Sequence, residues 1–457
     1  MTQTTTLERP PATETARRIA ALRRRRWYQQ PRWARLAALV FAAFVLDVAS
    51  GPQGSPDDVF YALKAVYKEP VSLFVCLALM VGIWAIAEFG WKYLSPYVDQ
   101  AKTAAGNAGS ATREVIGQPR IKWPLAIAGV ALLVALPELL STYWNQVMVG
   151  EVAIFVLLAI GLNVVVGWAG LLDLGFIAFF AIGAYSAAYW TGALPVAPPF
   201  ELTPFLVIPV AVLTCLIAGV LLGAPTLRLR GDYLAIVTLG FHEIIYLIAK
   251  NKEDFTNGPR GATGIPGFNL FGYKWGLDPK QYWWLILALA AILIFLFLRL
   301  EHSRIGRAWA AIREDEVAAA ANGVNTVKFK LMAFAIGAST SGVAGVVYAS
   351  KQQFISPESF VLLSSILVLS YVIFGGMGSL WGVVVGTTFL AWLPARLKDV
   401  VDPKDRYMYL GALLVIMMIY RPQGLIPSRR RRREITLAQQ GIGDADAMSE
   451  PVGGRVA

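Results

Sequence analysis

Residues 282–299 read YWWLILALAAILIFLFLR and carry no charge before the final arginine. A helix needs about 20 predominantly apolar residues to cross the hydrocarbon core of a bilayer. Runs of similar length recur on both sides of this stretch, so the sequence predicts an all-α polytopic membrane protein with roughly ten to twelve transmembrane helices. The candidate spans are residues 33–50, 70–91, 123–142, 147–168, 170–190, 204–224, 232–249, 282–299, 327–349, 359–376, 379–395 and 407–420.

The composition of the 457-residue chain excludes several other classes of protein. Hydrophobic residues make up 56% and charged residues only 16%, whereas a soluble domain carries about 25% charged residues. The net charge of +11 is divided among clusters at span ends, which disfavours nucleic acid as a partner. The 2 cysteines lie in apolar runs and there are only 2 histidines, so we expect neither a disulfide framework nor a metal site.

The same residues argue against an enzyme. A Ser-His-Asp set is implausible with so few histidines, and the nucleotide-binding pattern GxxxxGK[ST] is absent from the sequence. We therefore expect no catalytic residues and no cofactor bound by this chain. A pore, a secondary transporter or the membrane subunit of an ATP-driven system remain.

Clusters of basic residues orient the chain, because Lys and Arg are retained on the cytoplasmic side of a membrane. With the arginine-rich arm 1–32 inside, alternating spans place every further basic cluster inside as well, and both termini are predicted to be cytoplasmic. Adding or removing a pair of spans would preserve this parity. The arm followed by Val48-Ala49-Ser50 also resembles a cleavable signal sequence, but it is unusually long for one. The further clusters are residues 92–122, Arg228 with Arg230, Arg304 to Arg313, and Arg429 to Arg433.

Residues 303–324 read SRIGRAWAAIREDEVAAAANGV. The segment is alanine-rich and charged and ends near Gly323, which predicts a short cytoplasmic helix with a C-terminal cap. Composition alone is equally compatible with an ordinary amphipathic helix on the membrane surface.

This segment resembles the coupling loop of ABC importer permeases, in which an alanine pair and a glycine four residues on dock onto the ATPase subunit. Ala318, Ala319 and Gly323 keep that spacing, whereas Val317 replaces the usual glutamate and Glu316 lies one residue earlier. The segment fits the narrower pattern of branched-chain amino acid permeases, RxGRA…IRE[DN]E…A…G[VI][ND]. The matching residues are Arg304, Gly306, Arg307, Ala308, Ile312, Arg313, Glu314, Asp315, Glu316, Ala319, Gly323, Val324 and Asn325.

Three further segments resemble the same family, so the resemblance covers most of residues 147–427. They are GWAGLLDLG at 167–175 with AFFAIGAY at 178–185, TNGP at 256–259 with GIPG at 264–267, and FGGMGSLWG at 374–382 with RPQGL at 421–425. The long N-terminal extension resembles the M-type permease of the leucine-isoleucine-valine system, not the shorter H-type. The resemblance implies an ABC importer permease fold with a permease core at 147–427, extra transmembrane helices at 33–142, a basic cytoplasmic arm at 1–32 and a basic cytoplasmic tail at 428–457.

The resemblance also implies the function and the partners. It implies a permease subunit of an ATP-driven importer for leucine, isoleucine and valine in the inner membrane of a bacterium. The implied partners are an H-type second permease, two ATP-binding subunits that use ATP and Mg, a periplasmic substrate-binding protein and membrane lipid. The implied ATPase-coupling residues are Arg304, Gly306, Arg307, Arg313, Glu314, Asp315, Glu316, Ala318, Ala319 and Gly323.

The Gly/Pro-rich stretch 256–267 cannot be helical and faces outside in the predicted topology. It is either a plain connecting loop or, as the resemblance implies, a contact surface for the binding protein. Its candidate contact residues are Gly258, Pro259, Arg260 and Gly264.

Polar groups within the apolar runs are candidates for the translocation path, because a carboxylate in a membrane is costly and by default indicates function. The competing explanation is a helix cap or a contact with headgroups, which is favoured for Glu151. His242 departs from the small residue that the family places before Glu243. The candidate path residues are Asn163, Gly170, Asp173, Gly175 and Glu243.

Three alternative functions stay open from the sequence. A permease for urea or short-chain amides would share the fold. An ion-coupled secondary transporter would bind its ion near Asp173 or Glu243, and a channel-like leak would need no partner.

Overall fold

The structure is a computed structural model that describes residues 119–226, 232–270, 273–399, 406–421 and 423–428. Its contacts divide the chain between Gly129 and Val130, and the description below concerns the unit from Val130 onward. The predicted spans at 33–50 and 70–91, the arm 1–32, Arg228 with Arg230, and the tail after Ser428 lie outside the described residues.

Six helices in the described part of the chain are long and apolar enough to cross a membrane. A helical multi-pass membrane protein is therefore confirmed, while the predicted total of ten to twelve spans extends into residues that the structure does not describe. The six are Thr142–Trp168, Pro204–Ala224, Tyr233–Asn251, Pro279–Glu301, Thr326–Gln352 and Pro357–Gly375, and Gly129–Leu139, Phe176–Trp190 and Arg406–Ile419 are shorter apolar helices.

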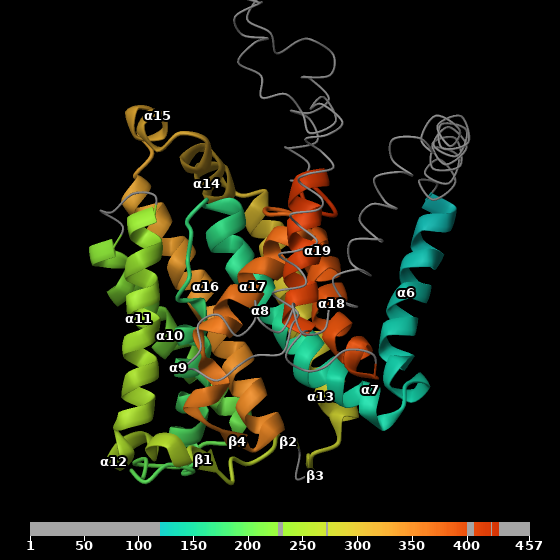
Figure 1. Cartoon of the computed structure of the whole chain (residues 1–457), viewed down its shortest axis with the longest axis vertical. Coiled ribbons are helices and arrows are strands. Elements are labelled where there is room, and N and C mark those ends of the chain that lie inside the picture. Colours follow the sequence, from blue (N-terminus) through green and yellow to red (C-terminus); the bar gives the residue numbers. More distant parts are fainter. Residues whose placement is uncertain (1–118, 227–231, 271–272, 400–405, 422, 429–457) are drawn as a thin grey trace, which may run out of the picture. The chain divides into compact units, whose positions relative to one another are not determined.

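Helices dominate the fold and four short strands lie at one end of it (Figure 1). Strand β1 (Ala262–Thr263) pairs antiparallel with β4 (Phe354–Ile355), with Ala262 opposite Ile355, and β2 (Asn269–Leu270) pairs with β3 (Tyr273–Lys274). The helices are α6 (Pro119–Leu139), α7 (Thr142–Val147), α8 (Ile154–Leu162), α9 (Phe176–Trp190), α10 (Pro204–Thr226), α11 (Asp232–Asn251), α12 (Glu253–Thr256), α13 (Pro279–Glu301), α14 (Arg304–Glu314), α15 (Glu316–Ala321), α16 (Thr326–Gln352), α17 (Leu362–Gly375), α18 (Leu380–Arg396) and α19 (Arg406–Tyr420).

Two π-helical turns interrupt the span Thr142–Trp168. The first, η3 (Met148–Ala153), joins α7 to α8, and the second, η4 (Asn163–Trp168), follows α8. Such wide turns inside α-helices are frequent at functional sites. Short 3₁₀ turns η5 (Gly258–Arg260), η6 (Pro357–Phe360) and η7 (Leu397–Asp399) complete the described structure.

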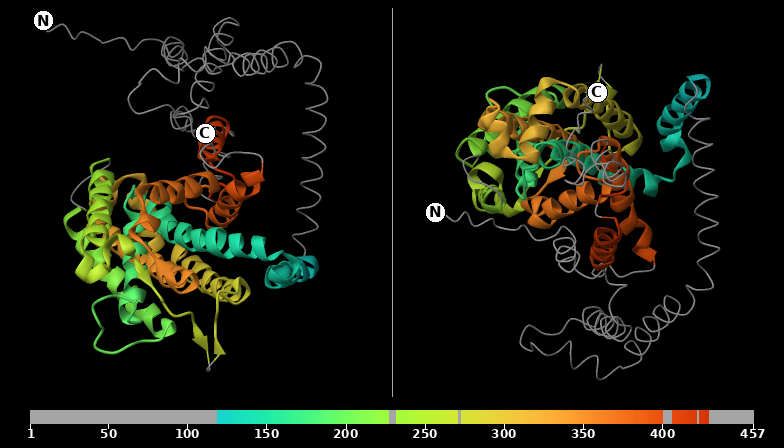
Figure 2. Two further views of the ribbon diagram at one scale, coloured as in Figure 1. Left: turned by 60° about the horizontal axis from the view of Figure 1, so that its bottom comes forward. Right: turned by 90° about the horizontal axis from the view of Figure 1, so that it is seen from above.

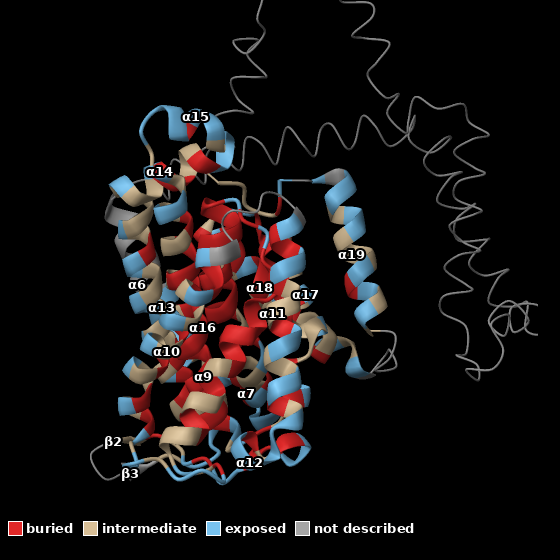
Figure 3. Ribbon diagram, turned by 90° about the vertical axis from the view of Figure 1, so that its left-hand side faces the viewer, coloured by how far each residue is buried: buried red, intermediate tan, exposed pale blue. Residues whose placement is uncertain are grey.

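Helix α16 lies at the centre and packs closely on α8, α9 and α10. Small residues allow this approach, since a Cβ built on Gly345 would lie 2.5 Å from the Phe180 carbonyl oxygen and one on Gly342 would lie 2.7 Å from Cys215 Sγ. Figure 3 shows α9 and α16 largely buried, whereas α19 is mostly exposed or half-buried. Large apolar side chains are exposed on the outer helices, for example Leu221 on α10, Ile236 on α11 and Ile419 on α19, as expected of surfaces that face lipid or a partner subunit.

The ends of the helices form two opposite groups. Helices α14 and α15 lie at one end, and α12, β1 and β4 lie at the other (Figure 1). The β2–β3 hairpin projects from the bundle (Figure 2, left). Residues 303–324 and 256–267 therefore lie on opposite sides of the bundle, as the alternating topology predicts.

The predicted span 170–190 is wrong at its start. The helix α9 begins only at Phe176, and residues 169–175 are irregular. Gly170 adopts a φ of +72°, and an Asp173 carboxylate oxygen accepts a hydrogen bond from the Gly175 N–H at 2.8 Å. This side-chain bond to the backbone competes with helix formation, although the apolar run itself continues through the segment.

The single helix predicted within 303–324 is also wrong, because the segment forms α14 and α15. Asp315 between them is extended, with φ −155° and ψ 111°. Its carboxylate accepts from the N–H groups of Val317 at 2.8 Å and Ala318 at 3.0 Å, so it starts a new helix as an N-cap. The predicted cap at the far end is confirmed, since Gly323 has a φ of +82° and its N–H donates to the Ala320 carbonyl at 3.0 Å.

Candidate functional site

Helix α14 is fixed to the bundle along one face. The Ser303 hydroxyl caps its first turn by accepting from the Ile305 N–H at 3.1 Å. Ala308, Trp309 and Ile312 are buried, and the Trp309 indole N–H donates to the Phe329 carbonyl at 2.7 Å. The charged residues of α14, Arg304, Arg307, Arg313 and Glu314, are exposed, and Gly306 is half-buried.

Helix α15 presents small side chains outward. Ala319 is buried, and Glu316 holds the helix to α16 through an ion pair with Lys330 at 2.5 Å. The exposed side of α15 is then free for another protein to contact. We call this exposed set the small-residue patch: Val317, Ala318, Ala320, Ala321 and Gly323.

Arg313 connects α14 to two distant segments. Its guanidinium donates to the Gly167 carbonyl at the end of η4. A Cβ built on Gly170 would lie 2.7 Å from Arg313 Cγ, and one on Gly378 would lie 3.0 Å from Arg313 Nη1. The two glycines therefore leave the space through which the arginine passes.

Trp168 and Asn163 strengthen the same connection. The Trp168 ring stacks on the Trp309 ring, with centroids 6.2 Å apart and planes at 22°, and its N–H donates to the Gly378 carbonyl at 3.3 Å. The Asn163 side-chain oxygen accepts from the Gly378 N–H at 2.8 Å. We call this set the junction: Asn163, Gly167, Trp168, Gly170, Trp309, Arg313 and Gly378.

Residues 424–426 pack against residues 374–376, close to Gly378 of the junction. The N–H of Leu425 donates to the Phe374 carbonyl at 2.9 Å, and that of Ile426 donates to the Gly375 carbonyl at 3.1 Å. Gly376 adopts a φ of +115°, which favours glycine. Three of the four motif groups quoted from the sequence thus meet at one place.

The irregular segment 169–175 links the junction to α11 and α17. The Leu174 N–H donates to the Thr238 hydroxyl at 3.1 Å, and the Ser365 hydroxyl donates to the Leu174 carbonyl at 2.6 Å. Gly175 lies directly against the Thr238 carbonyl. Asp173 is fully buried. Neighbouring helices thus satisfy both backbone polar groups of Leu174, which a non-helical residue inside a membrane requires.

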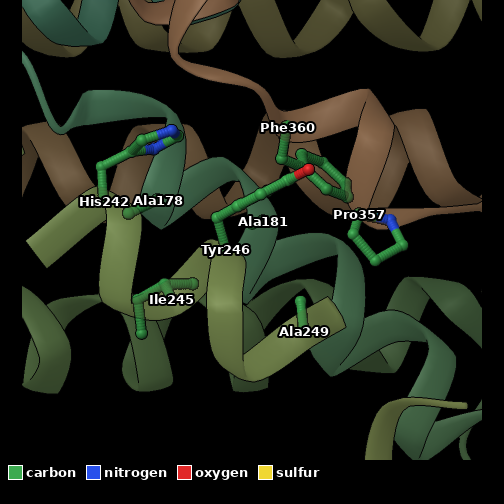
Figure 4. Close-up of a pocket in the computed structure, with 8 residues that line it drawn as sticks. All are labelled: Ala178, Ala181, His242, Ile245, Tyr246, Ala249, Pro357 and Phe360. Atoms are coloured by element: carbon green, nitrogen blue, oxygen red, sulfur yellow. The ribbon is translucent and has the colours of Figure 1, made fainter. Parts of the chain in front are cut away.

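Helix α11 lines an apolar recess with α9 and η6 (Figure 4). His242 and Tyr246 of α11 face Ala181 of α9 and Phe360 of η6 across it. His242 is buried, and neither ring nitrogen has a hydrogen-bond partner among the described residues. Glu243, its neighbour near the middle of the span, is exposed.

Three polar side chains tie the far end of α11 to η6. The Tyr246 hydroxyl donates to a Glu358 carboxylate oxygen at 3.2 Å and accepts from Lys250 at 3.2 Å. Lys250 also pairs with Glu358 at 3.4 Å.

The Gly/Pro-rich stretch 256–267 is ordered by its own hydrogen bonds. Asn257 has a φ of 64°, and its side-chain N–H donates to the Gly261 carbonyl at 2.6 Å. The stretch is not α-helical beyond Thr256, as predicted, and holds the 3₁₀ turn η5 and the strand β1. Among the candidate contacts Gly258 is buried, while Pro259, Arg260 and Gly264 are exposed.

Comparison with known proteins gives the family. Residues 147–419 match the family described as "Branched-chain amino acid transport system / permease component". The chain belongs to this family.

The relatives support an M-type permease. The chain is 39% identical over 308 residues to the high-affinity branched-chain amino acid transport system permease protein LivM of Salmonella typhimurium, covering 63% of this chain and 71% of the relative. It is 40% identical over 299 residues to LivM of Escherichia coli, covering 61% and 68%. The permease protein LivH of Salmonella typhimurium is 27% identical over 199 residues, covering 39% and 60%. No solved structure matches. The predicted resemblance to the M-type, over the H-type, is confirmed.

The structure distributes the candidate path residues of this LivM-type permease over three places. Asn163 and Gly170 belong to the junction, Asp173 and Gly175 lie in the segment against α11, and Glu243 lies on the exposed side of α11. The first four are thus connected with one another through the stretch 163–175.

Sequence reasoning missed several residues that the structure makes prominent. Trp168 and Trp309 lie within quoted motifs but were given no role, and the stacking of their rings joins segments far apart in the chain. Lys330 was a usable signal, because a lysine inside the apolar run 327–349 needs a partner, and that partner is Glu316.

Proposed function

We propose that this LivM-type permease forms, with a second permease of the H-type, the substrate passage of an ATP-driven importer for leucine, isoleucine and valine. Relatives of this chain include both LivM and LivH proteins, each named as a branched-chain amino acid permease. Two separate ATP-binding subunits would supply the energy and use ATP and Mg, and a periplasmic binding protein would deliver the substrate. The complex would lie in the inner membrane, with both termini of this chain in the cytoplasm.

The observation that carries the proposal is the connection of α14 to the bundle through Arg313. The exposed small-residue patch of α15 is the docking surface that we propose for an ATPase subunit. A movement of that subunit would push α14 and α15 together, and the hydrogen bond from Arg313 to Gly167 would transmit the push to η4 and the segment 169–175. Repacking of helices around such a point opens a passage to the other side in alternating access.

The end of the bundle opposite α14 and α15 offers a surface where substrate could arrive. Pro259, Arg260 and Gly264 are exposed at the end of the bundle that lies away from α14 and α15. We propose this end as the contact for the binding protein, which places substrate delivery and ATPase docking on opposite sides of the membrane.

The test is uptake into proteoliposomes that contain both permeases, the ATPase subunits and the binding protein. We expect ATP-dependent uptake of leucine, and its loss when Gly323 is replaced by leucine, because the positive φ of Gly323 disfavours any side chain and the patch would become bulky. Gly411→Leu on α19 is the matched control, since a Cβ built there also meets nothing within 4 Å.

Unchanged uptake by Gly323→Leu would remove the coupling assignment. Competition by urea or a short-chain amide in place of leucine would favour the amide alternative. Uptake driven by an ion gradient without ATP would favour a secondary transporter.

A further inference from the structure

Lys351 is a buried ammonium that lacks an ion-pair partner within 4 Å among the described residues. It lies in the last turn of α16 and is 9% exposed. Its Nζ makes a long hydrogen bond of 3.4 Å to the side-chain oxygen of Gln352. The lysines at 250, 280 and 330 each pair with a carboxylate instead. A desolvated charge without an ion-pair partner is costly and, inside a membrane protein, points to function.

The ammonium lies against a π-helical turn. A Cβ built on Gly150 of η3 would lie 3.0 Å from Lys351 Nζ, so the absence of a side chain at Gly150 gives the ammonium its place. The next residue, Glu151, is exposed and within electrostatic range of Lys351. The phenol of Tyr371 is within electrostatic range of the Glu151 carboxylate.

A positive and a negative group thus stand near each other but more than ion-pair distance apart. A free amino acid carries a carboxylate and an ammonium on neighbouring carbons, so it can bridge two such groups. Phe155, one turn after Glu151, forms an edge-to-face pair with Tyr371, with centroids 5.8 Å apart. This aromatic pair supplies apolar surface on the Glu151 side of the two charges.

The pair lies toward the end of the bundle where we propose that substrate arrives. Two residues after Lys351 the chain leaves α16, and β4 then pairs with β1 of the Gly/Pro-rich stretch. Helix α16 begins at the other end, next to α15.

We propose that Lys351 and Glu151 form a binding site for the zwitterionic head group of the amino acid during its passage. The Lys351 ammonium binds the α-carboxylate, and the Glu151 carboxylate binds the α-ammonium. This inference rests on the proposed function, since it supposes that amino acids pass through this chain. It also explains how one passage serves leucine, isoleucine and valine, because the site reads only the head group that they share.

The first experiment measures uptake of leucine by the complete complex in proteoliposomes. Lys351→Met and Glu151→Gln should each lower the initial rate at least tenfold while the complex still assembles and hydrolyses ATP. The control is Lys280→Met, which removes a lysine from an exposed pair with Glu138 at 2.8 Å and should change the rate less than twofold. A rate within twofold of the unchanged complex for Lys351→Met would overturn the site.

The second experiment separates substrate binding from a purely structural charge or a contact with lipid phosphate. Lys351→Cys, in a chain with Cys76→Ala and Cys215→Ala, is treated with aminoethyl methanethiosulfonate, which forms a mixed disulfide, releases methanesulfinate and restores an ammonium. We expect the reagent to restore uptake at least fivefold, sulfonatoethyl methanethiosulfonate to restore none, and leucine to slow the labelling. A thiol that does not react, or that reacts equally fast with and without leucine, overturns the site.

The two proposals can fail separately. Labelling and its protection by leucine need no ATP, so they test the site even if the complex shows no ATP-dependent uptake. Absence of ATP-dependent uptake in the unchanged complex would contradict the proposed function instead.

Discussion

The ion pair between Glu316 and Lys330 should determine whether α15 stays folded on α16. The Lys330 side chain is only 4% exposed and that of Glu316 is 26% exposed, with 2.5 Å between them. Glu316→Gln leaves the lysine charge buried without its carboxylate, and removing one partner of a buried pair costs about 3–5 kcal/mol. Because Glu316 is partly solvated, we expect the low end, about 3 kcal/mol.

The lost stabilisation should lower the free energy needed to unfold α15 locally. The helix has 6 residues, and besides the ion pair only Ala319 is buried in it. Since about 1.4 kcal/mol corresponds to a tenfold change in an equilibrium, the protection of the α15 backbone N–H groups against hydrogen exchange should fall about 100-fold.

Hydrogen exchange read by mass spectrometry on the purified permease pair measures this change. Glu314→Gln, which removes an exposed carboxylate two residues away, is the matched control and should leave the exchange of α15 unaltered. The double variant Glu316→Gln with Lys330→Met should recover most of the protection, because it leaves no buried charge unpaired. Exchange of α15 within threefold of the unchanged protein in Glu316→Gln would refute the reasoning.

Three further substitutions test the junction and the helices that it reaches. Arg313→Ala should lower ATP-dependent leucine uptake at least tenfold with normal insertion, and Arg313→Lys should recover only part of it because the guanidinium donates from a planar fork. Gly175→Val should lower the melting temperature of the permease pair steeply, since its side chain would overlap the Thr238 carbonyl, whereas Gly276→Val, which meets nothing within 4 Å, should not. Glu243→Gln should reduce either uptake or co-purification of the second permease, because a carboxylate exposed near mid-span needs a polar neighbour beyond the described residues, and we expect the second permease or the substrate to supply it; normal values for both would contradict that expectation.

Much of the fold could be predicted because the membrane imposes one length on every span. The run 282–299 became α13 at Pro279–Glu301, and the run 327–349 became α16 at Thr326–Gln352. Each helix extends a few residues beyond its apolar run, since caps such as Asp278 and Asn325 act outside it. The basic clusters gave a separate signal, cytoplasmic retention of Lys and Arg, and the opposite placement of residues 303–324 and 256–267 agrees with the alternation that they predict.

The break at 169–175 could not be predicted from hydrophobicity. Its residues are as apolar as a span, so periodicity and run length do not distinguish them from the start of α9. The helix is interrupted by a local polar contact, the hydrogen bond from the Gly175 N–H to the Asp173 carboxylate. The break is tolerated because two distant hydroxyls, those of Thr238 and Ser365, bond the backbone of Leu174. A single sequence does not show which distant hydroxyl meets which backbone group.

The junction was visible in the sequence only as separate motifs. Gly167 and Gly378 are 211 positions apart, and the arginine that joins them belongs to a third segment. The structural need for glycine at positions 170 and 378 becomes clear only from the path of the Arg313 side chain, which passes close to both. The motifs show that glycine stands at these positions, but they do not show why. The cause is a side chain from another helix, Arg313 of α14, that occupies the space beside them.

The junction also explains why a signal from α14 would reach more than one helix. Arg313 donates to the Gly167 carbonyl in η4, and the irregular residues 169–175 follow that turn directly. Leu174, within those residues, is hydrogen-bonded on one side to α11 and on the other to α17. We therefore expect a shift of α14 that keeps these bonds to reach both helices, and α11 is the one with an exposed carboxylate near mid-span. In this arrangement the irregular segment 169–175 connects one input to two outputs. The input is the end of the bundle that we propose to contact the ATPase, and the outputs are α17 and α11, whose exposed surface would meet a second permease or the substrate.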